Sequence, residues 1–383
     1  MCGVGLDILP VYRYTGYSEI NRTPHIQDII EEESIMKESY FKRVHAQTPT
    51  RMWINNVSRS QADLAIAAGA TGCTQNPAYT WKMMQDPEER PYVMEKLAEI
   101  LKDEPDDTQA LVKLQRTLVE GIAQKFMPMY EASHCQCGYV SIQGDPFDET
   151  EESIVKYAKY NTANLPNMTA KIPVVPGGIK AIKKLAPERV PINTTEIMTI
   201  RQALDIADIY AGVCAKIDNP APIYYSVITG IYDQYLAKYV QDKGIDVSPD
   251  AVWQAGLAVA KKTYAAVKER SSQIRFIGGG ARGLHHFTEM VGADCVVTIN
   301  WKGTADQLIE QDPPVVQRFA MPIPQSVIDE LTEKVDEFRR AYYVHGITEE
   351  EYEDYGPVVL FRSSFEDAWK NALAEVKAQR AAQ

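Results

Sequence analysis

After Pro49, short apolar segments alternate with longer amphipathic stretches, and this alternation restricts the possible folds more than any other feature of the chain. Short apolar runs bounded by turn residues predict buried strands, and the stretches between them carry apolar residues at helical spacing. Regular alternation of the two is typical of parallel strands joined by crossover helices. The predicted strands are Met52–Val57, Ala70–Thr74, Gly138–Gln143, Met168–Val175, Val190–Asn193, Ile223–Ile228, Ile274–Gly278 and Cys295–Ile299.

Parallel strands of this number form either a closed barrel or an open sheet. The predicted strands end in polar residues around the whole set, as the rim of a barrel requires, whereas an open sheet collects its site at one switch point. We therefore predict an α/β fold, a (βα)8 TIM barrel over residues 51–320 with a helical insertion at about 85–133. Residues 1–50 are mixed and turn-rich and are predicted to form an N-terminal extension packed on the barrel. Residues 321–383 are predicted to form a C-terminal helical extension.

Charge and hydropathy exclude two classes of partner. The 383-residue chain has a net charge of −12 and a pI of about 5.1, which disfavours a nucleic-acid-binding face but permits a local basic pocket. Its mean hydropathy is −0.29, and no apolar run approaches the roughly 20 residues of a membrane span. The N-terminus MCGVGLDILPVYRY does not resemble a signal peptide. We expect a cytoplasmic protein that binds neither nucleic acid nor membrane.

Cysteines and paired histidines are the candidates for a metal site. In a cytoplasmic protein the six cysteines are expected to be reduced, buried and unreactive. The segment HCQC at 134–137 has no second ligand pair to complete four ligands. His285 and His286 are predicted to begin the helix after the seventh strand, and the sequence shows no third ligand for them. No metal site is predicted.

Lys171 lies inside the apolar segment NMTAKIPVVPGG. Burial of an ammonium group costs several kcal/mol unless the group loses its proton or finds a partner. Desolvation lowers the pKa of a lysine and yields a neutral amine that can attack a carbonyl. A lysine whose stem is buried and whose ammonium group reaches solvent is the alternative.

Polar groups at the other strand ends favour the reactive lysine. A single polar strand end is ordinary, because Asn, Ser and Thr are common in turns. Five strand ends that converge on a buried lysine are what a polyhydroxylated substrate requires. They read WINNVSR (53–59), GCTQNP (72–77), YVSIQGDP (139–146), INTTEI (192–197) and IGGGARG (277–283).

In these segments the chain resembles the transaldolase family. WINNVSR resembles the family motif WLDNLSR, GCTQNPAY resembles GVTSNPTI, and VSIQGDP resembles VSxEVDP. KIPVVPGGIKAIKKL is similar to the Schiff-base segment KIPATxEGIxAIxxL, and INTTEIMTIRQA is similar to INxTLxFSxxQA. GGGAR and the tail FRRAYYVHGITEEEYEDYGP also match, so the resemblance covers roughly residues 45–370.

The resemblance implies a role for each matched position. Lys171 is the expected Schiff-base lysine, Thr195 is expected to orient a catalytic water, and Arg282 is expected to bind the phosphate end of the substrate. Asn76 and Asn193 are expected to contact the donor's hydroxyls. The expected catalytic residues are Lys171, Asn55, Gln143 and Thr195, and the expected substrate-binding residues are Thr74, Asn76, Asn193, Ser226 and Arg282.

Three positions depart from the family pattern. The family's acid/base aspartate falls at Asn55, whose amide cannot shuttle a proton near neutral pH. The third-strand glutamate falls at Gln143, as in the fructose-6-phosphate aldolase branch. A second phosphate-binding arginine falls near Gly230. The proton would then be transferred by water, Thr195, Asp145 or a tyrosine such as Tyr225. The sequence around Asp145 is also typical of a turn residue that caps the following helix.

Three functions are consistent with these features. The first is a transaldolase-type transferase or aldolase that moves or reversibly cleaves a three-carbon dihydroxyacetone unit of a sugar or sugar phosphate through a Lys171 imine, without a cofactor. The second keeps the imine but catalyses a changed reaction on an unusual sugar. The third is a non-catalytic barrel that binds a sugar phosphate. The sequence leaves open whether the protein forms a homo-oligomer.

Overall fold

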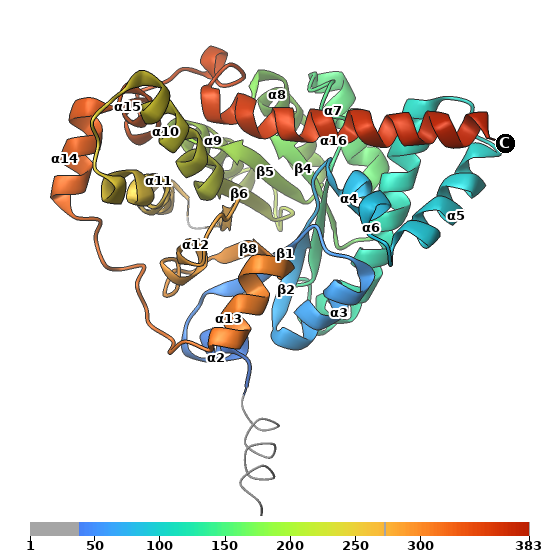
Figure 1. The fold of residues 1–383 in the computed structure, drawn as a ribbon, viewed down its shortest axis with the longest axis horizontal. Helices are drawn as coiled ribbons and strands as arrows, with labels where there is room; N and C mark the ends of the chain where they lie inside the picture. Colours follow the sequence, from blue (N-terminus) through green and yellow to red (C-terminus); the bar gives the residue numbers. More distant parts are fainter. Residues whose placement is uncertain (1–37, 272, 383) are drawn as a thin grey trace, which may run out of the picture. The chain divides into compact units, whose positions relative to one another are not determined.

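The computed structural model describes residues 38–271 and 273–382, which contain eight parallel strands closed into a barrel (Figure 1). The strand order around the barrel follows the sequence, and β1 pairs with β8 to complete the ring. The predicted (βα)8 barrel is therefore confirmed. The strands are β1 (Arg51–Asn55), β2 (Ala70–Thr74), β3 (Tyr139–Gln143), β4 (Met168–Pro173), β5 (Ile192–Ile197), β6 (Ile223–Ile228), β7 (Arg275–Gly279) and β8 (Val296–Asn300).

Each predicted strand overlaps an observed strand, and the clearest difference is at β5. The sequence predicts a strand over Val190–Asn193, whereas the observed strand extends to Ile197. Thr194, Thr195 and Glu196 are polar and break the apolar pattern, although all three are fully buried. Residues at the carboxyl ends of barrel strands contribute to the site, so hydrophobic periodicity does not mark them as strand.

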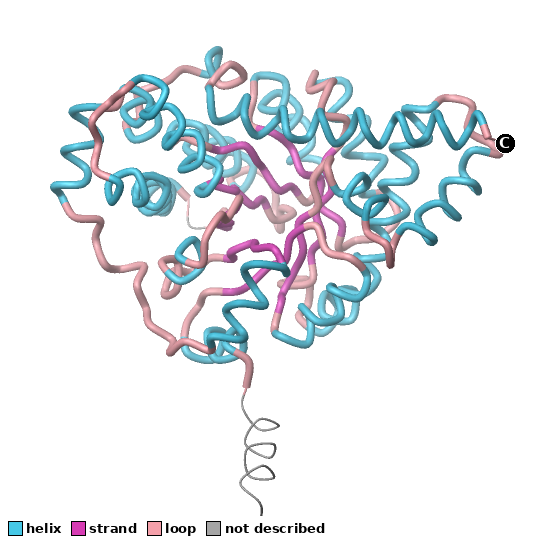
Figure 2. Tube along the Cα trace, in the orientation of Figure 1, coloured by secondary structure: helices cyan, strands magenta, loops and turns pink. Residues whose placement is uncertain are grey.

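Helices alternate with the strands and surround them (Figure 2). Local signals set their ends: Ser58 caps the first crossover helix in a capping box with Gln61, and Gly69 ends that helix in the left-handed conformation at φ 113°. Among the described residues, no helix combines the length and apolar character needed to cross a membrane. The helices are α2 (Tyr40–Gln47), α3 (Arg59–Ala68), α4 (Tyr79–Gln85), α5 (Arg90–Leu101), α6 (Asp107–Ala132), α7 (Glu151–Thr162), α8 (Pro176–Leu185), α9 (Ile200–Cys214), α10 (Thr229–Lys243), α11 (Pro249–Arg270), α12 (His285–Thr288), α13 (Asp306–Gln311), α14 (Gln325–Lys334), α15 (Asp336–Tyr342) and α16 (Gly356–Ala381).

Aromatic side chains fill the part of the barrel interior near the amino ends of the strands. The rings of Trp53 and Tyr224 lie 5.0 Å apart, and Tyr139 packs edge-on against Tyr224 at 6.1 Å. Gly72 permits this packing, because a Cβ there would lie 2.4 Å from the Trp53 ring. In barrels of this kind the site forms at the opposite end, where the strands finish.

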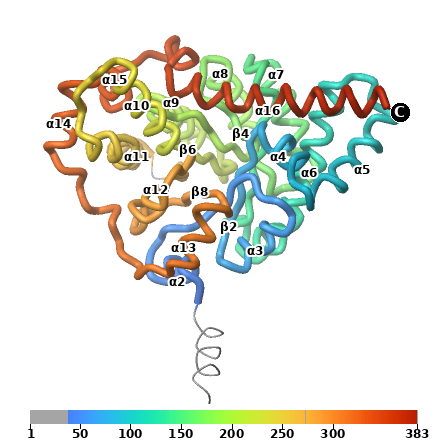
Figure 3. The backbone as a smooth tube through the Cα atoms, viewed as in Figure 1, coloured from blue at the N-terminus to red at the C-terminus, as the bar shows by residue number. Residues whose placement is uncertain are grey.

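The long C-terminal helix α16 closes part of that end. It spans 26 residues, packs against α4, α6 and α10, and crosses the top of the barrel in the view of Figure 3. Phe361, Ser364 and Phe365 on this helix line the cavity at the strand ends. The predicted C-terminal helices therefore contribute directly to the site.

Most of the predicted N-terminal extension, residues 1–37, lies outside the described residues. The described part differs from the turn-rich prediction, because Tyr40–Gln47 form helix α2. Phe41 on this helix is fully buried and packs edge-on against Phe287 at 5.0 Å.

Candidate active site

A cavity of about 450 Å³ opens where the barrel strands end. Its wall is polar at the barrel and partly aromatic at α16. Seven of the nine predicted site residues line it, and Gln143 and Asn193 do not. The lining includes Asn55, Thr74, Asn76, Lys82, Asp86, Lys171, Thr195, Ser226, Gly279, Gly280, Arg282, Thr298, Asn300, Lys302, Phe361, Ser364 and Phe365.

Lys171 is the reactive group best placed in this cavity. It lies on β4, its residue surface is 8% exposed, and no described residue accepts a hydrogen bond from its Nζ. Burial lowers the pKa of Lys171 from 10.5 to about 8, and the nearby Glu196 carboxylate opposes that fall. About a tenth of the amine is then neutral at pH 7, several hundred times more than for an exposed lysine.

Asn55 and Thr74 form a hydrogen-bonded rim on β1 and β2. Thr74 Oγ1 donates to Asn55 Oδ1 at 2.9 Å, and Asn55 Nδ2 donates to Asn300 Oδ1 at 3.0 Å. Both sides of the Asn55 amide therefore have partners, which fixes its orientation in the cavity wall. An amide held in this way binds hydroxyl groups but provides no acid or base at neutral pH.

The predicted donor-binding residues divide into two groups. Asn76, Thr195 and Ser226 line the cavity, and Thr195 Oγ1 is buried without a hydrogen-bond partner among the described residues. Asn193 is fully buried and does not line the cavity. Its Oδ1 accepts from Ser226 Oγ at 2.7 Å and its Nδ2 donates to Ser141 Oγ at 3.2 Å, so it orients Ser226 from beneath.

Gln143 is hydrogen-bonded to Glu196, a residue that was not predicted from the sequence. Gln143 Nε2 donates to Glu196 Oε1 at 3.3 Å, and both side chains are buried. Glu196 has a left-handed backbone at φ 62°, and the β5–β6 register shifts beside it. A non-glycine residue in this conformation costs roughly 1–3 kcal/mol and is frequent at functional sites. The signal was present in the sequence, because Glu196 stands where the resembled motif INxTLxF has leucine.

Arg282 brings a cation to the rim after β7. Its Nε donates to Gln234 Oε1 at 3.1 Å and its Nη1 to the Ala281 carbonyl at 3.2 Å. Two lysines that sequence reasoning did not select, Lys82 and Lys302, also line the cavity. With Lys171 these make four basic side chains against one carboxylate, Asp86, among the described lining residues. The site therefore favours anions although the chain carries a net charge of −12.

No side chain can occupy position 230, where the resemblance expects an arginine. A Cβ on Gly230 would lie 2.3 Å from the Gly280 carbonyl oxygen and 2.7 Å from the Arg282 backbone nitrogen. The close approach of these two loops therefore requires glycine. Lys82 and Lys302 supply positive charge to the cavity instead.

Two of the alternative proton donors do not line this large cavity. Tyr225 packs edge-on against Phe276 at 5.1 Å and does not line the cavity, because its neighbour Ser226 faces inward. Asp145 lines a separate small cavity with Gln143 and Lys171, and its carboxylate accepts from the Phe147 N–H at 2.9 Å. The following helix is capped by Thr150, so the prediction that Asp145 caps it is wrong.

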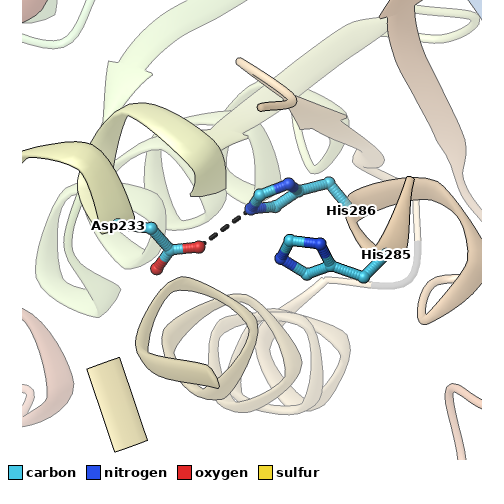
Figure 4. Close-up of side chains that lie close together, drawn as sticks. All are labelled: Asp233, His285 and His286. Carbon is cyan, nitrogen blue, oxygen red and sulfur yellow. Dashed lines mark hydrogen bonds and ion pairs between the residues drawn. The ribbon is translucent and has the colours of Figure 1, made fainter. Parts of the chain in front are cut away.

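His285 and His286 do have a third candidate ligand, contrary to the sequence prediction. Their rings lie beside Asp233 on α10, and the three candidate ligand atoms are within 4.8 Å of one another (Figure 4). Both ring nitrogens of His286 already have hydrogen-bond partners. Its Nε2 lies 2.8 Å from Asp233 Oδ2, and its Nδ1 accepts from the backbone N–H groups of Arg282 and Gly283. Asp233 Oδ1 accepts from the Gly256 N–H at 2.6 Å. The arrangement therefore holds the loop that carries Arg282 in place.

The cysteine prediction holds only in part. Cys73 and Cys295 are buried, and burial raises the pKa of both thiols. Cys135 is exposed, whereas Cys137 and Cys214 are half-buried. The turn that carries Cys135 has a left-handed backbone at φ 64°, which projects it from the end of α6.

The chain is similar in sequence to known proteins over most of its length. The transaldolase/fructose-6-phosphate aldolase family matches residues 52–355. A transaldolase of Thiobacillus denitrificans is 23% identical over 321 residues, which cover 76% of this chain and 88% of the relative. Transaldolases of Saccharopolyspora erythraea and Mycobacterium bovis are each 25% identical, over 61% and 57% of this chain and 66% and 62% of the relatives. The chain belongs to the transaldolase/fructose-6-phosphate aldolase family.

Proposed function

We propose that the protein transfers or reversibly cleaves a three-carbon dihydroxyacetone unit of a sugar phosphate through a Schiff base on Lys171. The observation that carries this proposal is the position of Lys171 at a polar cavity, with its pKa lowered by burial to about 8. A neutral amine is the nucleophile that imine formation needs. Membership of the family supports the reaction class.

The chemistry follows from the imine. The Lys171 amine adds to the ketone carbon of the donor, and loss of water gives an iminium ion. The iminium accepts the electron pair of the adjacent C–C bond as that bond breaks, and the hydroxyl group on the departing carbon gives its proton to water. An aldehyde is released and an enamine remains on the lysine. For transfer, the enamine carbon forms a bond to the carbonyl carbon of a second aldehyde, whose oxygen takes a proton; for cleavage, the enamine carbon takes a proton. Hydrolysis of the resulting iminium then releases the product and restores the Lys171 amine.

The remaining cavity groups fit a phosphorylated polyol. We assign Thr74, Asn76 and Ser226 to the substrate's hydroxyl groups, with Asn193 acting by orienting Ser226. Thr195 Oγ1 has an unused hydrogen-bonding capacity and is assigned to a reacting water. Arg282, with Lys82 and Lys302, is assigned to the phosphate, because guanidinium and ammonium groups form charge-assisted bonds to its oxygens.

One observation favours a changed reaction on the same imine. Asn55 presents an amide, fixed by Thr74 and Asn300, where the resemblance expects a carboxylate. A carboxylate in that place would take the proton of the hydroxyl group whose C–C bond breaks. The second candidate is therefore a Schiff-base enzyme that acts on an unusual sugar.

Trapping with sodium borohydride and a panel of ketoses tests the proposal. We expect the reduced adduct on the peptide that contains Lys171, and its loss in Lys171→Met. Donors that are trapped and then release an aldehyde identify C–C cleavage, and donors trapped without release identify the changed reaction. Binding of sugar phosphates with no adduct from any ketose would identify a non-catalytic barrel and refute the proposal.

A further inference from the structure

Behind Lys171 lies a group of buried polar side chains that the reaction above does not use. Both carboxyl oxygens of Glu149, Oε2 of Glu196 and Oε1 of Gln143 are buried without a hydrogen-bond partner among the described residues. Arg362 Nη1 lies 3.6 Å from Glu149 Oε2, too far for a hydrogen bond. Burial of carboxyl groups with so few partners is costly, so stability does not explain them.

These groups are close to the Lys171 amine. Gln143 pairs with Lys171 across β3 and β4, and its Nε2 is bonded to Glu196 Oε1 at 3.3 Å. A small cavity of about 20 Å³ is lined by Gln143, Glu149 and Lys171. That volume holds about one water molecule, and the polar lining provides the partners that a buried water requires.

The two carboxyl groups compete for negative charge. Burial raises the pKa of Glu149 and Glu196, and the charge of Glu196 raises that of Glu149 further. Two buried carboxyl groups that interact in this way do not both ionise near neutral pH, so the pair keeps a proton. Asp145 and Asp148 line the small cavity beside Glu149. The charged groups that shift the pair's pKa values are Lys171 on β4, Arg362 and Glu366 on α16, and Glu353 before it: the two basic groups lower these values and the two acidic groups raise them.

We propose that Glu196 and Glu149 share the proton that is exchanged during Schiff-base formation and hydrolysis at Lys171. Glu196 is on β5, and Glu149 is in the loop between β3 and α7. The two carboxyl groups take the place of the carboxylates that the family pattern has at positions 55 and 143, where this chain has Asn55 and Gln143. This inference rests on the proposed Schiff base and identifies its acid and base.

The proton balance is complete with water alone. The neutral Lys171 nitrogen forms a bond to the ketone carbon, the carbonyl electron pair moves to oxygen, and one proton passes from nitrogen to that oxygen. The protonated carboxyl then gives its proton to the hydroxyl group, the C–O bond breaks, and water leaves as the nitrogen lone pair forms the iminium. In hydrolysis a water adds to the iminium carbon and the carboxylate takes the proton back.

Glu196→Gln tests this assignment in the full chain. Dihydroxyacetone is the probe, the reductant is sodium cyanoborohydride in excess, and mass spectrometry follows the adduct on the Lys171 peptide. We expect trapping to slow by roughly 10²–10⁴-fold, the usual contribution of a positioned acid or base. Glu188→Gln is the matched control, because its exposed carboxylate pairs with Lys159 at 2.6 Å and does not face the pair; its trapping rate should be unchanged.

A swap variant separates catalysis from structure. Gln143→Glu with Glu196→Gln exchanges the amide and the carboxyl within the same hydrogen-bonded pair. This double variant should recover most of the trapping rate that Glu196→Gln loses. If Glu196 has only a structural role, we expect no recovery. Equal trapping rates in the native chain and Glu196→Gln would overturn the inference while leaving the Schiff base intact, and absence of any adduct in the native chain would instead refute the Schiff base.

Glu149→Gln keeps the inference testable if Glu196→Gln does not fold. The trapping rate should rise as Lys171 loses its proton near pH 8 and fall at higher pH as the pair loses its own. Burial and the charge of Glu196 raise the pKa of Glu149 to about 9, whereas the pKa of Glu196 is about 7. Without Glu149 only Glu196 remains to hold the proton, so the fall should move to lower pH. An unchanged pH profile in the folded variant would refute the shared proton.

Discussion

Replacing Lys171 by methionine removes the buried amine and keeps an unbranched side chain of similar length. In the native chain the pKa of Lys171 falls from 10.5 to about 8 because burial favours the neutral form. That fall corresponds to about 3.4 kcal/mol, at about 1.36 kcal/mol for each pH unit. Methionine does not incur this cost, so the free energy of unfolding of Lys171→Met should exceed that of the native protein near neutral pH.

The sign and the pH range follow from proton binding. Between about pH 8 and 10.5 the unfolded lysine binds a proton and the folded one does not, so the native protein gains stability as pH rises. Below about pH 8 the cost is fully present. The advantage of Lys171→Met should therefore shrink by about 2.5 kcal/mol between pH 7 and pH 10.

Urea unfolding followed by circular dichroism at pH 7 and pH 10 measures this difference. Lys180→Met is the control, because Lys180 is exposed on α8 and its removal relieves no burial. Glu196 titrates beside Lys171, so the comparison is repeated in a Glu196→Gln background. An advantage of Lys171→Met that is the same at both pH values would show that the amine is not desolvated and would refute the argument for its reactivity.

Two further substitutions test the rim of the cavity. Arg282→Ala should raise KM for a phosphorylated ketose by roughly tenfold to a hundredfold, which corresponds to about 1.5–3 kcal/mol for a charge-assisted bond. The KM for unphosphorylated donors should not change. Equal effects on both donor types in steady-state assays would contradict a phosphate role. Asn55→Asp should increase turnover of fructose 6-phosphate with an aldose phosphate acceptor, because it restores a proton acceptor beside Thr74 while Asn300 can turn its amide to donate. Robust native turnover of that pair that is lost in Asn55→Asp would show that the amide itself serves the reaction.

The barrel could be read from the sequence because its signal is local. Each strand is a short apolar run, each crossover helix has its own periodicity, and caps such as Ser58 and Gly69 mark the boundaries within a few residues. The prediction weakened where side chains face the site. Thr194 to Glu196 continue β5 yet carry no apolar signal, so the end of that strand was missed.

The position of Lys171 could also be predicted, since a lysine within an apolar strand is unusual in any fold. Its chemical environment could not be. The pKa of the amine depends on how completely the folded chain excludes water, and part of that exclusion comes from Phe365, which is 194 residues away in sequence and whose ring centroid lies 5.7 Å from Nζ.

Contacts between distant segments decided the remainder of the site. The barrel, the lysine and the polar strand ends can be predicted from the sequence, because each depends on a pattern within a few neighbouring residues. Only the tertiary structure placed Asp233 against His286 and Glu196 against Gln143. Glu196, which accepts from Gln143, has a left-handed backbone, and such a conformation is stabilised by the packed barrel around it, not by the residues beside it in sequence.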